Sequence, residues 1–208
     1  ELNVLIAQKR ANPYDPTQSI ESLRGNGPDG GSIARPDTIV TSSDADGVYG
    51  EWVAWGAPAT QSVFMFLHGG GYYRSSAKAS RRVASNLSKA CGCRCFTVDY
   101  SLAPEHPFPA AVDDAYTVYH WLLKQGISAE QIVVGGSSAG GGLTAALLAK
   151  LKLNGEKQPA GAVLLSPWTD LTQSAGTFVS NADSDPTISK LYLDRMAKQY
   201  LNGADPTD

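Results

Sequence analysis

Apolar and polar positions divide the chain into short strand-like runs and longer amphipathic segments. Positions 48–55 alternate as in a half-buried strand, and 62–67 form a continuous apolar run, typical of a strand covered on both faces. Further on, helical patterns alternate with apolar runs. Helices are predicted at 77–90, 110–125, 139–153 and 188–201, and strands at 93–100, 132–136 and 161–168. Strands joined through helices form a mostly parallel sheet, so the predicted fold class is α/β.

The first 46 residues differ in composition from the rest. They are rich in Pro, Gly, Asn, Asp and Ser, and helical patterns occur only near the start and at 18–24. We therefore expect residues 1–46 to form an N-terminal arm and residues 47–170 to form the α/β core.

Four short motifs lie where the predicted strands end. Because the carboxyl ends of parallel strands share one edge of a sheet, ligands and catalytic groups collect there. The motifs are HGGG at 68–71, YSLAPE at 100–105, SSAG at 137–140 and SPWTD at 166–170. We expect the functional residues among them.

Composition narrows the classes of partner. The 208 residues carry a formal net charge of -3, and 42% of them are hydrophobic, enough for one substantial core. Basic residues form no stripe longer than Arg81-Arg82, so no nucleic-acid partner is expected. No apolar stretch approaches the roughly 20 residues of a membrane span, and no signal-peptide pattern is visible at the start, which favours a cytoplasmic location.

Three cysteines, Cys91, Cys93 and Cys95, would share one face of an extended segment. Metal sites usually need a second group of ligands, and the three histidines of the chain show no matching spacing. We interpret the cysteines as small core residues and expect no metal.

The segment 135–142, GGSSAGGG, joins a predicted strand to a predicted helix and has two interpretations. A dinucleotide-binding turn would need an acidic residue about 20 positions on, at the end of the next strand, but that strand ends in Ser166-Pro167-Trp168. A phosphate-binding P-loop would need a lysine where Leu143 stands. Both nucleotide patterns are therefore disfavoured.

The second interpretation is a tight turn that presents a nucleophilic serine. The pattern G-x-S-x-G requires small residues two positions before and after the serine, because a Cβ atom there would clash with neighbouring backbone. Ser138 has Gly136 and Gly140 at these positions, whereas Ser137 is followed two positions on by Ala139. We therefore predict that Ser138 is the nucleophile.

Acyl transfer also needs hydrogen-bond donors for the oxygen that becomes negative. The HGGG motif at 68–71 follows a buried strand, and its glycines leave backbone N–H groups open to a substrate. A competing serine chemistry is the S-x-x-K pattern of Ser75 and Lys78, but its supporting S-D-N and K-T-G signatures are missing. We interpret Ser75 and Lys78 as the start of a helix.

The motifs HGGGYY, DYSLAPEHPFPAA, GGSSAGGG and SPWTDL closely resemble the hormone-sensitive-lipase-like group of α/β-hydrolase esterases, in order over about residues 48–208. This resemblance implies Ser138 as nucleophile and the backbone N–H groups of Gly70, Gly71 and Ala139 as the oxyanion hole. It also implies short-to-medium acyl esters as substrates and no cofactor.

The resemblance further implies an α-helical cap, built from the N-terminal arm and from a second segment at 171–208. His68 would brace the glycine loop and would not act as the base. Tyr72 and Tyr73 are candidates for lining the substrate pocket, with ordinary packing as the alternative.

Two positions depart from the usual motifs of this group. Ser137 stands where Asp is common, and Ser101 stands where Arg is common. Both changes remove a charge from the surroundings of the nucleophile and leave the nucleophile itself in place.

The triad order in this fold is Ser, then Asp or Glu, then His, and no histidine follows Ser138. His106 lies in a proline-rich turn and His120 in a predicted helix, so both are interpreted as structural, and Asp170 has no histidine to orient. We therefore expect a chain cut short by about a hundred residues, a sheet that lacks its C-terminal strands, and a triad acid and histidine outside these residues.

The sequence thus predicts a serine carboxylesterase whose partner is a small-molecule ester, with a homodimer left open. Two alternatives remain at this stage. One is a receptor-like protein that binds a small molecule on the same scaffold without catalysis, since a fold does not fix a function. The other is an inactive fragment of the esterase.

Overall fold

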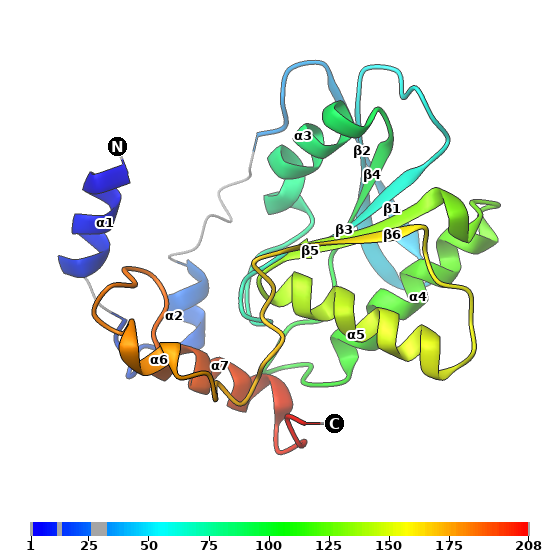
Figure 1. Ribbon diagram of the computed structural model, residues 1–208. Helices are drawn as coiled ribbons and strands as arrows, with labels where there is room; N and C mark the ends of the chain where they lie inside the picture. Colours follow the sequence, from blue (N-terminus) through cyan, green and yellow to red (C-terminus); the bar gives the residue numbers. More distant parts are fainter. Residues whose placement is uncertain (1, 12–13, 26–32, 208) are drawn as a thin grey trace.

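The computed structural model describes residues 2–11, 14–25 and 33–207. In this part of the chain a six-stranded sheet has the strand order β1-β2-β4-β3-β5-β6 (Figure 1). The strands are β1 (Thr38–Ala45), β2 (Val48–Trp55), β3 (Val63–Leu67), β4 (Arg94–Val98), β5 (Ile132–Ser137) and β6 (Gly161–Leu165).

The sheet is parallel except at one edge. Strand β3 pairs in parallel with β4 and β5, and β5 pairs in parallel with β6. The β1–β2 and β2–β4 pairs are antiparallel. All residues of β3 are buried, as its continuous apolar run predicts. The prediction of a mostly parallel α/β sheet is therefore confirmed.

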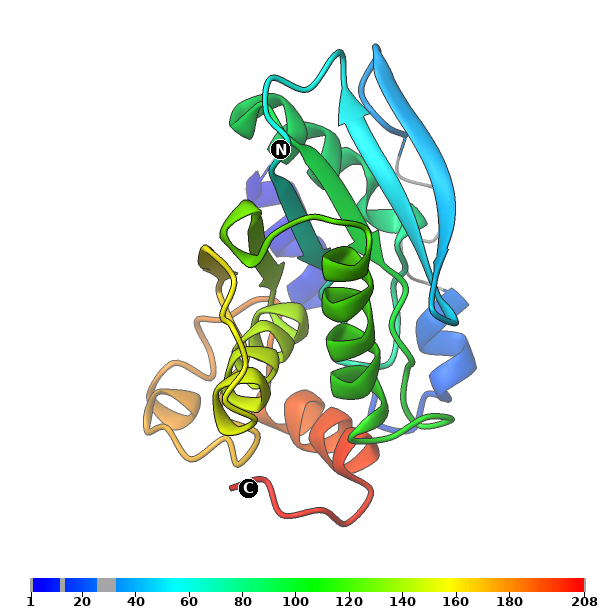
Figure 2. The same cartoon turned by 90° about the vertical axis from the view of Figure 1, so that its right-hand side faces the viewer.

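Helices cover both faces of the sheet. Helix α3 (Arg81–Cys91) packs on β2 and β4 on one face, whereas α4 (Ala110–Lys124) and α5 (Ala139–Leu153) run side by side on the other (Figures 1 and 2). Short 3-10 helices at Lys78–Ser80 and Ala129–Gln131 precede α3 and β5. In the described part of the chain, no helix has the length and apolar character needed to cross a membrane.

The remaining helices gather at the end of the molecule where α5 begins (Figure 1). They are α1 (Leu2–Ala11), α2 (Ile20–Gly25), α6 (Thr177–Ser180) and α7 (Lys190–Leu201). Arg195 of α7 donates hydrogen bonds to Tyr14 Oη at 2.8 Å, to the Pro16 carbonyl at 3.0 Å and to the Gln18 carbonyl at 2.6 Å. The two segments that the sequence assigns to a cap are therefore in contact.

The N-terminal arm is shorter than predicted. The sequence places residues 1–46 in the arm, but Thr38–Ala45 forms β1 and pairs along its whole length with β2. Asp46 and Gly47 close this hairpin with φ values of 56° and 95°, as in a two-residue type I′ turn. An Asp-Gly pair between two alternating segments is a hairpin signal, and it identifies the missed strand.

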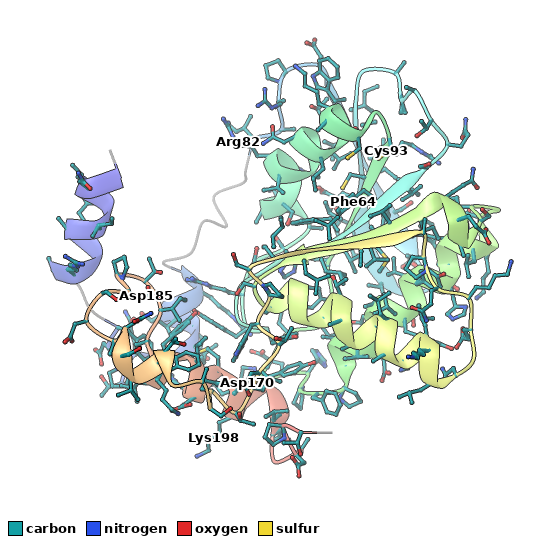
Figure 3. The ribbon with its side chains drawn as sticks, in the orientation of Figure 1. Phe64, Arg82, Cys93, Asp170, Asp185 and Lys198 are labelled. Atoms are coloured by element: carbon teal, nitrogen blue, oxygen red, sulfur yellow. The ribbon has the colours of Figure 1, made fainter. Side chains whose placement is uncertain are left out.

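The cysteines follow the core prediction only in part. Cys93 is buried with Phe64 on the α3 side of the sheet (Figure 3), and Cys95 belongs to the same buried cluster. Burial raises the pKa of both thiols. The expectation of one shared extended face is wrong for Cys91, which is exposed at the end of α3 because the chain turns at Gly92. Residues 2–11, 14–25 and 33–207 contain no group of three or more His, Cys, Asp or Glu arranged to hold a metal.

Strand β6 lies at the edge of the sheet and pairs with β5 alone within the described residues. Its apolar side chains are unusually open to solvent, with Val163 and Leu164 both 37% exposed and Leu165 45% exposed. This edge of the described sheet therefore presents apolar side chains to solvent.

Candidate active site

Ser138 occupies the sharp turn between β5 and α5. Its backbone has φ 53° and ψ −120°, a conformation that residues with a side chain rarely adopt, and the residue is exposed. Ser137 is the last residue of β5 and is only half-exposed. The turn therefore presents Ser138 to solvent more fully than its neighbour.

The glycines on either side of Ser138 are required by close backbone contacts. A Cβ atom at Gly140 would overlap the carbonyl oxygens of Leu67 and His68. One at Gly136 would overlap the backbone of Gly140 and lie 2.5 Å from the Leu67 oxygen. Because β3, β5 and α5 meet so closely at this turn, only glycine fits at the two positions.

Backbone hydrogen bonds hold the strained residue from several directions. The Ser138 N–H donates to the Leu165 carbonyl at 3.0 Å, and the Ser138 carbonyl accepts from the Trp168 N–H at 2.9 Å. The same carbonyl accepts from Gly141 and Gly142 in the first turn of α5, at 3.0 and 3.1 Å. A strained conformation persists where the surrounding structure over-determines it, which is the case here.

The HGGG loop lies directly against this turn. A Cβ atom at Gly69 would be 2.9 Å from the Ser137 carbonyl oxygen and 3.3 Å from the Ser138 Cβ. The next two N–H groups, those of Gly70 and Gly71, donate to no acceptor among the described residues. Two unpaired donors thus adjoin the exposed serine.

A third donor comes from α5. Ala139 is the first residue of this helix, and the first N–H groups of a helix have no intrahelical acceptor. They also carry the positive end of the helix dipole. The three amides that the family resemblance assigns to an oxyanion hole therefore belong to the start of α5 and to the loop whose Gly69 lies against the serine turn.

The glycine loop adopts left-handed backbone conformations. Gly70, Gly71 and Tyr72 have φ values of 121°, 62° and 62°. The Gly70 carbonyl accepts from the N–H groups of Tyr73 and Arg74, at 3.2 and 3.3 Å, which closes the loop into a turn. A Cβ atom at Gly70 would overlap the Arg74 carbonyl, so this turn excludes any other residue there.

His68 supports the HGGG loop through contacts of its ring and of its backbone. Its ring stacks on Tyr100, with 4.1 Å between centroids, and its Nδ1 lies 2.8 Å from the Gly69 carbonyl oxygen. The Tyr100 hydroxyl donates to the His68 carbonyl at 2.7 Å. Burial lowers the pKa of His68 to about 4, so its imidazole is neutral at pH 7.

Tyr72 and Tyr73, candidates for the substrate pocket, are both buried and packed against α7. The ring of Tyr72 stacks on Tyr200 with 3.8 Å between centroids, and the Tyr73 hydroxyl lies 3.0 Å from the Tyr192 hydroxyl. A cleft of about 280 Å³ adjoins the HGGG loop, with His68, Gly70, Arg74, Ser75 and Ser137 among its lining residues. Neither Tyr72 nor Tyr73 lines this cleft, and their role in a pocket stays a prediction.

No histidine of the described chain hydrogen-bonds to Ser138. His106 is exposed, and its backbone N–H donates to the Leu102 carbonyl at 2.9 Å. His120 lies in α4, with its Nε2 2.7 Å from the Glu156 carboxylate. Both placements agree with the structural interpretation of these two residues.

Asp170 lies in the loop that leaves β6 (Figure 3). Its carboxylate accepts hydrogen bonds from the side chains and backbone N–H groups of Thr172 and Ser174. The bonds from Thr172, followed by those from Ser174, lower the pKa of Asp170 to about 2. Asp170 therefore organises its own loop.

One residue that contacts the HGGG loop region is not indicated by any pattern in the sequence. Arg24 of α2 donates to the carbonyls of Tyr73 and Ala103 and to both carboxylate oxygens of Glu105. A single arginine in a Gly-rich arm gives no pattern from which these contacts could be found. They depend on how α2 lies against the core.

Comparison with known proteins gives concordant matches. The family described as alpha/beta hydrolase fold matches residues 64–208. An acetyl-hydrolase of Streptomyces hygroscopicus is 38% identical over 154 residues, which are 73% of this chain and 52% of the relative. Hormone-sensitive lipase of Mus musculus is 30% identical over 148 residues, which are 69% of this chain and 20% of the relative. The chain thus spans about half the length of the acetyl-hydrolase and a fifth of the lipase.

Solved structures agree along the whole chain. An esterase from the bacterial hormone-sensitive lipase family has a TM-score of 0.88 and 36% identity, covering 99% of this chain and 70% of its own. A structure of EstE5 soaked with p-nitrophenyl butyrate has a TM-score of 0.91 and 34% identity, covering 100% of this chain and 70% of its own. With this sheet, these helices and these matches, the chain belongs to the hormone-sensitive-lipase-like family of α/β hydrolases.

Proposed function

We propose that the protein is a carboxylic ester hydrolase that acts on short-to-medium acyl esters, with Ser138 as its nucleophile. The observation that carries the proposal is the strained, exposed Ser138 at the β5–α5 turn, with the HGGG loop lying against it; the Gly70 and Gly71 amides of this loop have no acceptor among the described residues. A turn held in this conformation by its surroundings is typical of a functional site. The acetyl-hydrolase and the esterase to which the chain is similar support the same chemistry.

In the proposed reaction, Ser138 Oγ forms a bond to the carbonyl carbon of the ester while its proton passes to a histidine. The negative oxygen of the tetrahedral intermediate accepts hydrogen bonds from the amides of Gly70, Gly71 and Ala139. The intermediate expels the alcohol, which takes the proton from the histidine. Water then releases the acid from the acyl-enzyme by the same steps, which regenerates Ser138.

The proposed base and acid are a histidine and a carboxylate outside these 208 residues. No described histidine reaches Ser138, and the carboxylate of Asp170 is engaged by its own loop. The protein supplies all of this chemistry from side chains and backbone amides, so the proposal includes no cofactor and no metal.

The test compares Ser138→Ala with Ser137→Ala in the full-length protein, which carries every residue that its gene encodes. Turnover of p-nitrophenyl acetate is expected to fall at least about a thousandfold in Ser138→Ala, since the nucleophile is removed. The Ser137→Ala variant should retain most of it. Retained activity in Ser138→Ala would overturn the assignment. An inactive wild-type full-length protein that still binds an ester would favour the receptor-like alternative.

A cytoplasmic location and a homodimer stay predictions of the sequence. Gel filtration combined with light scattering of the full-length protein would measure its oligomeric state.

A further inference from the structure

Arg24 links the N-terminal arm to the backbone of the glycine loop. Its Nε donates to the Tyr73 carbonyl at 2.6 Å, and one Nη donates to the Ala103 carbonyl at 2.8 Å. The two Nη groups also donate to the Glu105 carboxylate, at 2.7 and 2.6 Å. One guanidinium therefore uses its planar fork of donors on three different acceptor groups.

These acceptors belong to the two segments that shape the oxyanion loop. The Ala103 N–H donates to the Tyr72 carbonyl at 2.8 Å, so the segment at 100–105 is tied to the residue after Gly71. Arg24 donates to the next carbonyl, that of Tyr73, so two consecutive carbonyls after Gly71 accept hydrogen bonds from these segments. The positions of the Gly70 and Gly71 amides depend on the turn that the Gly70 carbonyl closes with the N–H groups of Tyr73 and Arg74.

The Arg24 guanidinium keeps Glu105 ionised down to low pH. Its hydrogen bonds hold the pKa of Glu105 at about 2, well below the usual range of a glutamate. The Arg24 side chain is 26% exposed, which leaves a path by which a small cation could reach the same place.

We propose that Arg24 is a positioning residue for the oxyanion loop, acting through the carbonyls of Tyr73 and Ala103. The inference rests on the proposed ester hydrolysis. Arg24 touches no reacting atom; it fixes the turn whose amides face the developing negative charge. Since misplacement of a catalytic group by about 1 Å can reduce a rate a hundredfold, such a brace affects kcat more than KM.

Arg195 of α7 provides a matched control, because its side chain also hydrogen-bonds across a contact with the N-terminal arm. Among the described residues Arg195 donates three hydrogen bonds, against four from Arg24, and its acceptors Tyr14, Pro16 and Gln18 lie outside the glycine loop. Replacing Arg195 removes a comparable number of contacts between the arm and its surroundings. A purely structural role for Arg24 would make the two replacements equivalent.

The experiment uses the full-length protein with Arg24→Ala and Arg195→Ala. For Arg24→Ala we expect kcat for p-nitrophenyl acetate to fall about tenfold or more with KM within about twofold, and ethylguanidinium to restore part of it. Arg195→Ala should change kcat little and should not respond to ethylguanidinium. Equal losses in the two variants, or no loss in Arg24→Ala, would overturn the inference.

Hydrogen–deuterium exchange separates failure of this inference from failure of the proposed function. In Arg24→Ala, exchange should increase in peptides that cover 69–76, and in Arg195→Ala it should increase at 14–18 instead. This result would support the positioning role even in a protein that hydrolyses no ester. Unchanged exchange at 69–76 in Arg24→Ala would overturn it, whatever the activity of the wild type.

Discussion

Tyr200 of α7 lies flat on Tyr72 of the glycine loop, with 3.8 Å between ring centroids and 10° between ring planes. Both rings are buried, at 3% exposure each. Tyr72 directly follows Gly71 and has a left-handed backbone, so this stack covers the loop that carries two of the proposed oxyanion donors. A segment near the end of the chain therefore stabilises a turn formed more than a hundred residues earlier.

The stack predicts different outcomes for two replacements of Tyr200. Tyr200→Ala should lower the free energy of unfolding by about 3 kcal/mol, because it removes a buried ring and leaves a cavity. Tyr200→Phe keeps the ring and should cost less than about 1 kcal/mol. Urea unfolding followed by circular dichroism would measure both, and similar values for the two variants would contradict a role for stacking.

Gly140 tests the steric basis of the serine turn. Gly140→Ala should lower the free energy of unfolding by about 3 kcal/mol or prevent folding, because its Cβ would overlap the Leu67 and His68 carbonyl oxygens. Gly176→Ala is the control, since no atom lies within 4 Å of a Cβ there and its φ is −59°. Thermal unfolding of both variants gives the comparison, and a Gly140→Ala protein as stable as Gly176→Ala would contradict the geometry.

Gly70 tests the oxyanion loop without touching the nucleophile. Gly70→Ala should lower kcat/KM for p-nitrophenyl acetate at least about a hundredfold, because its Cβ would overlap the Arg74 carbonyl and displace the amide donors. Gly47→Ala carries a comparable backbone penalty, with φ 95°, but lies in the β1–β2 turn in open space. Its kinetics should match the wild type, and a Gly70→Ala enzyme with normal kinetics would exclude this loop from the reaction.

Glu51 of β2, which is buried, forms an ion pair with Arg81 of α3, which is partly exposed. Glu51 is 2% exposed, and Arg81 Nε and Nη2 donate to its carboxylate at 2.7 and 2.6 Å. Burial alone would raise the pKa of Glu51, but the hydrogen bonds from Arg81 and Tyr49 outweigh it, and the pKa is lowered.

A lowered pKa means that this pair contributes stability above the pKa that Glu51 has when unfolded. The contribution is lost as the pH falls through the pKa of the folded state. Arg81→Met should therefore cost about 3 kcal/mol at pH 7 and clearly less near pH 3. Lys124→Met breaks the exposed pair with Asp46 and should cost less than about 1 kcal/mol at either pH. A cost for Arg81→Met that does not vary with pH would contradict the pairing.

The regular part of the fold was predictable because its periodicities are strong. Helix α5 has the predicted bounds 139–153, and the apolar run at 62–67 identified the buried strand β3. Strand β1 was missed because its residues alternate weakly within a Gly- and Pro-rich region, and only the Asp46-Gly47 turn signals it. A polar edge strand exposed on one face carries little hydrophobic pattern.

The site was predictable to the extent that steric rules act within short motifs. The spacing of Gly136, Ser138 and Gly140 follows from a turn that admits no Cβ atom at the two glycine positions, and the structure contains this turn. The contacts of Arg24 and the stacking of Tyr72 on Tyr200 were not predictable, because they join segments far apart in the sequence. Such contacts depend on the packing of the arm and α7, which no local pattern encodes.

The most direct test of the account is to trap the acyl-enzyme of the full-length protein. Acid quenching during turnover of p-nitrophenyl acetate, followed by peptide mass spectrometry, would locate the acetyl group. We predict that the acetyl group is on Ser138 and is absent from Ser138→Ala. An acetyl group on Ser75 or Ser137 during turnover, or ester hydrolysis with Ser138 never acylated, would contradict the central claim.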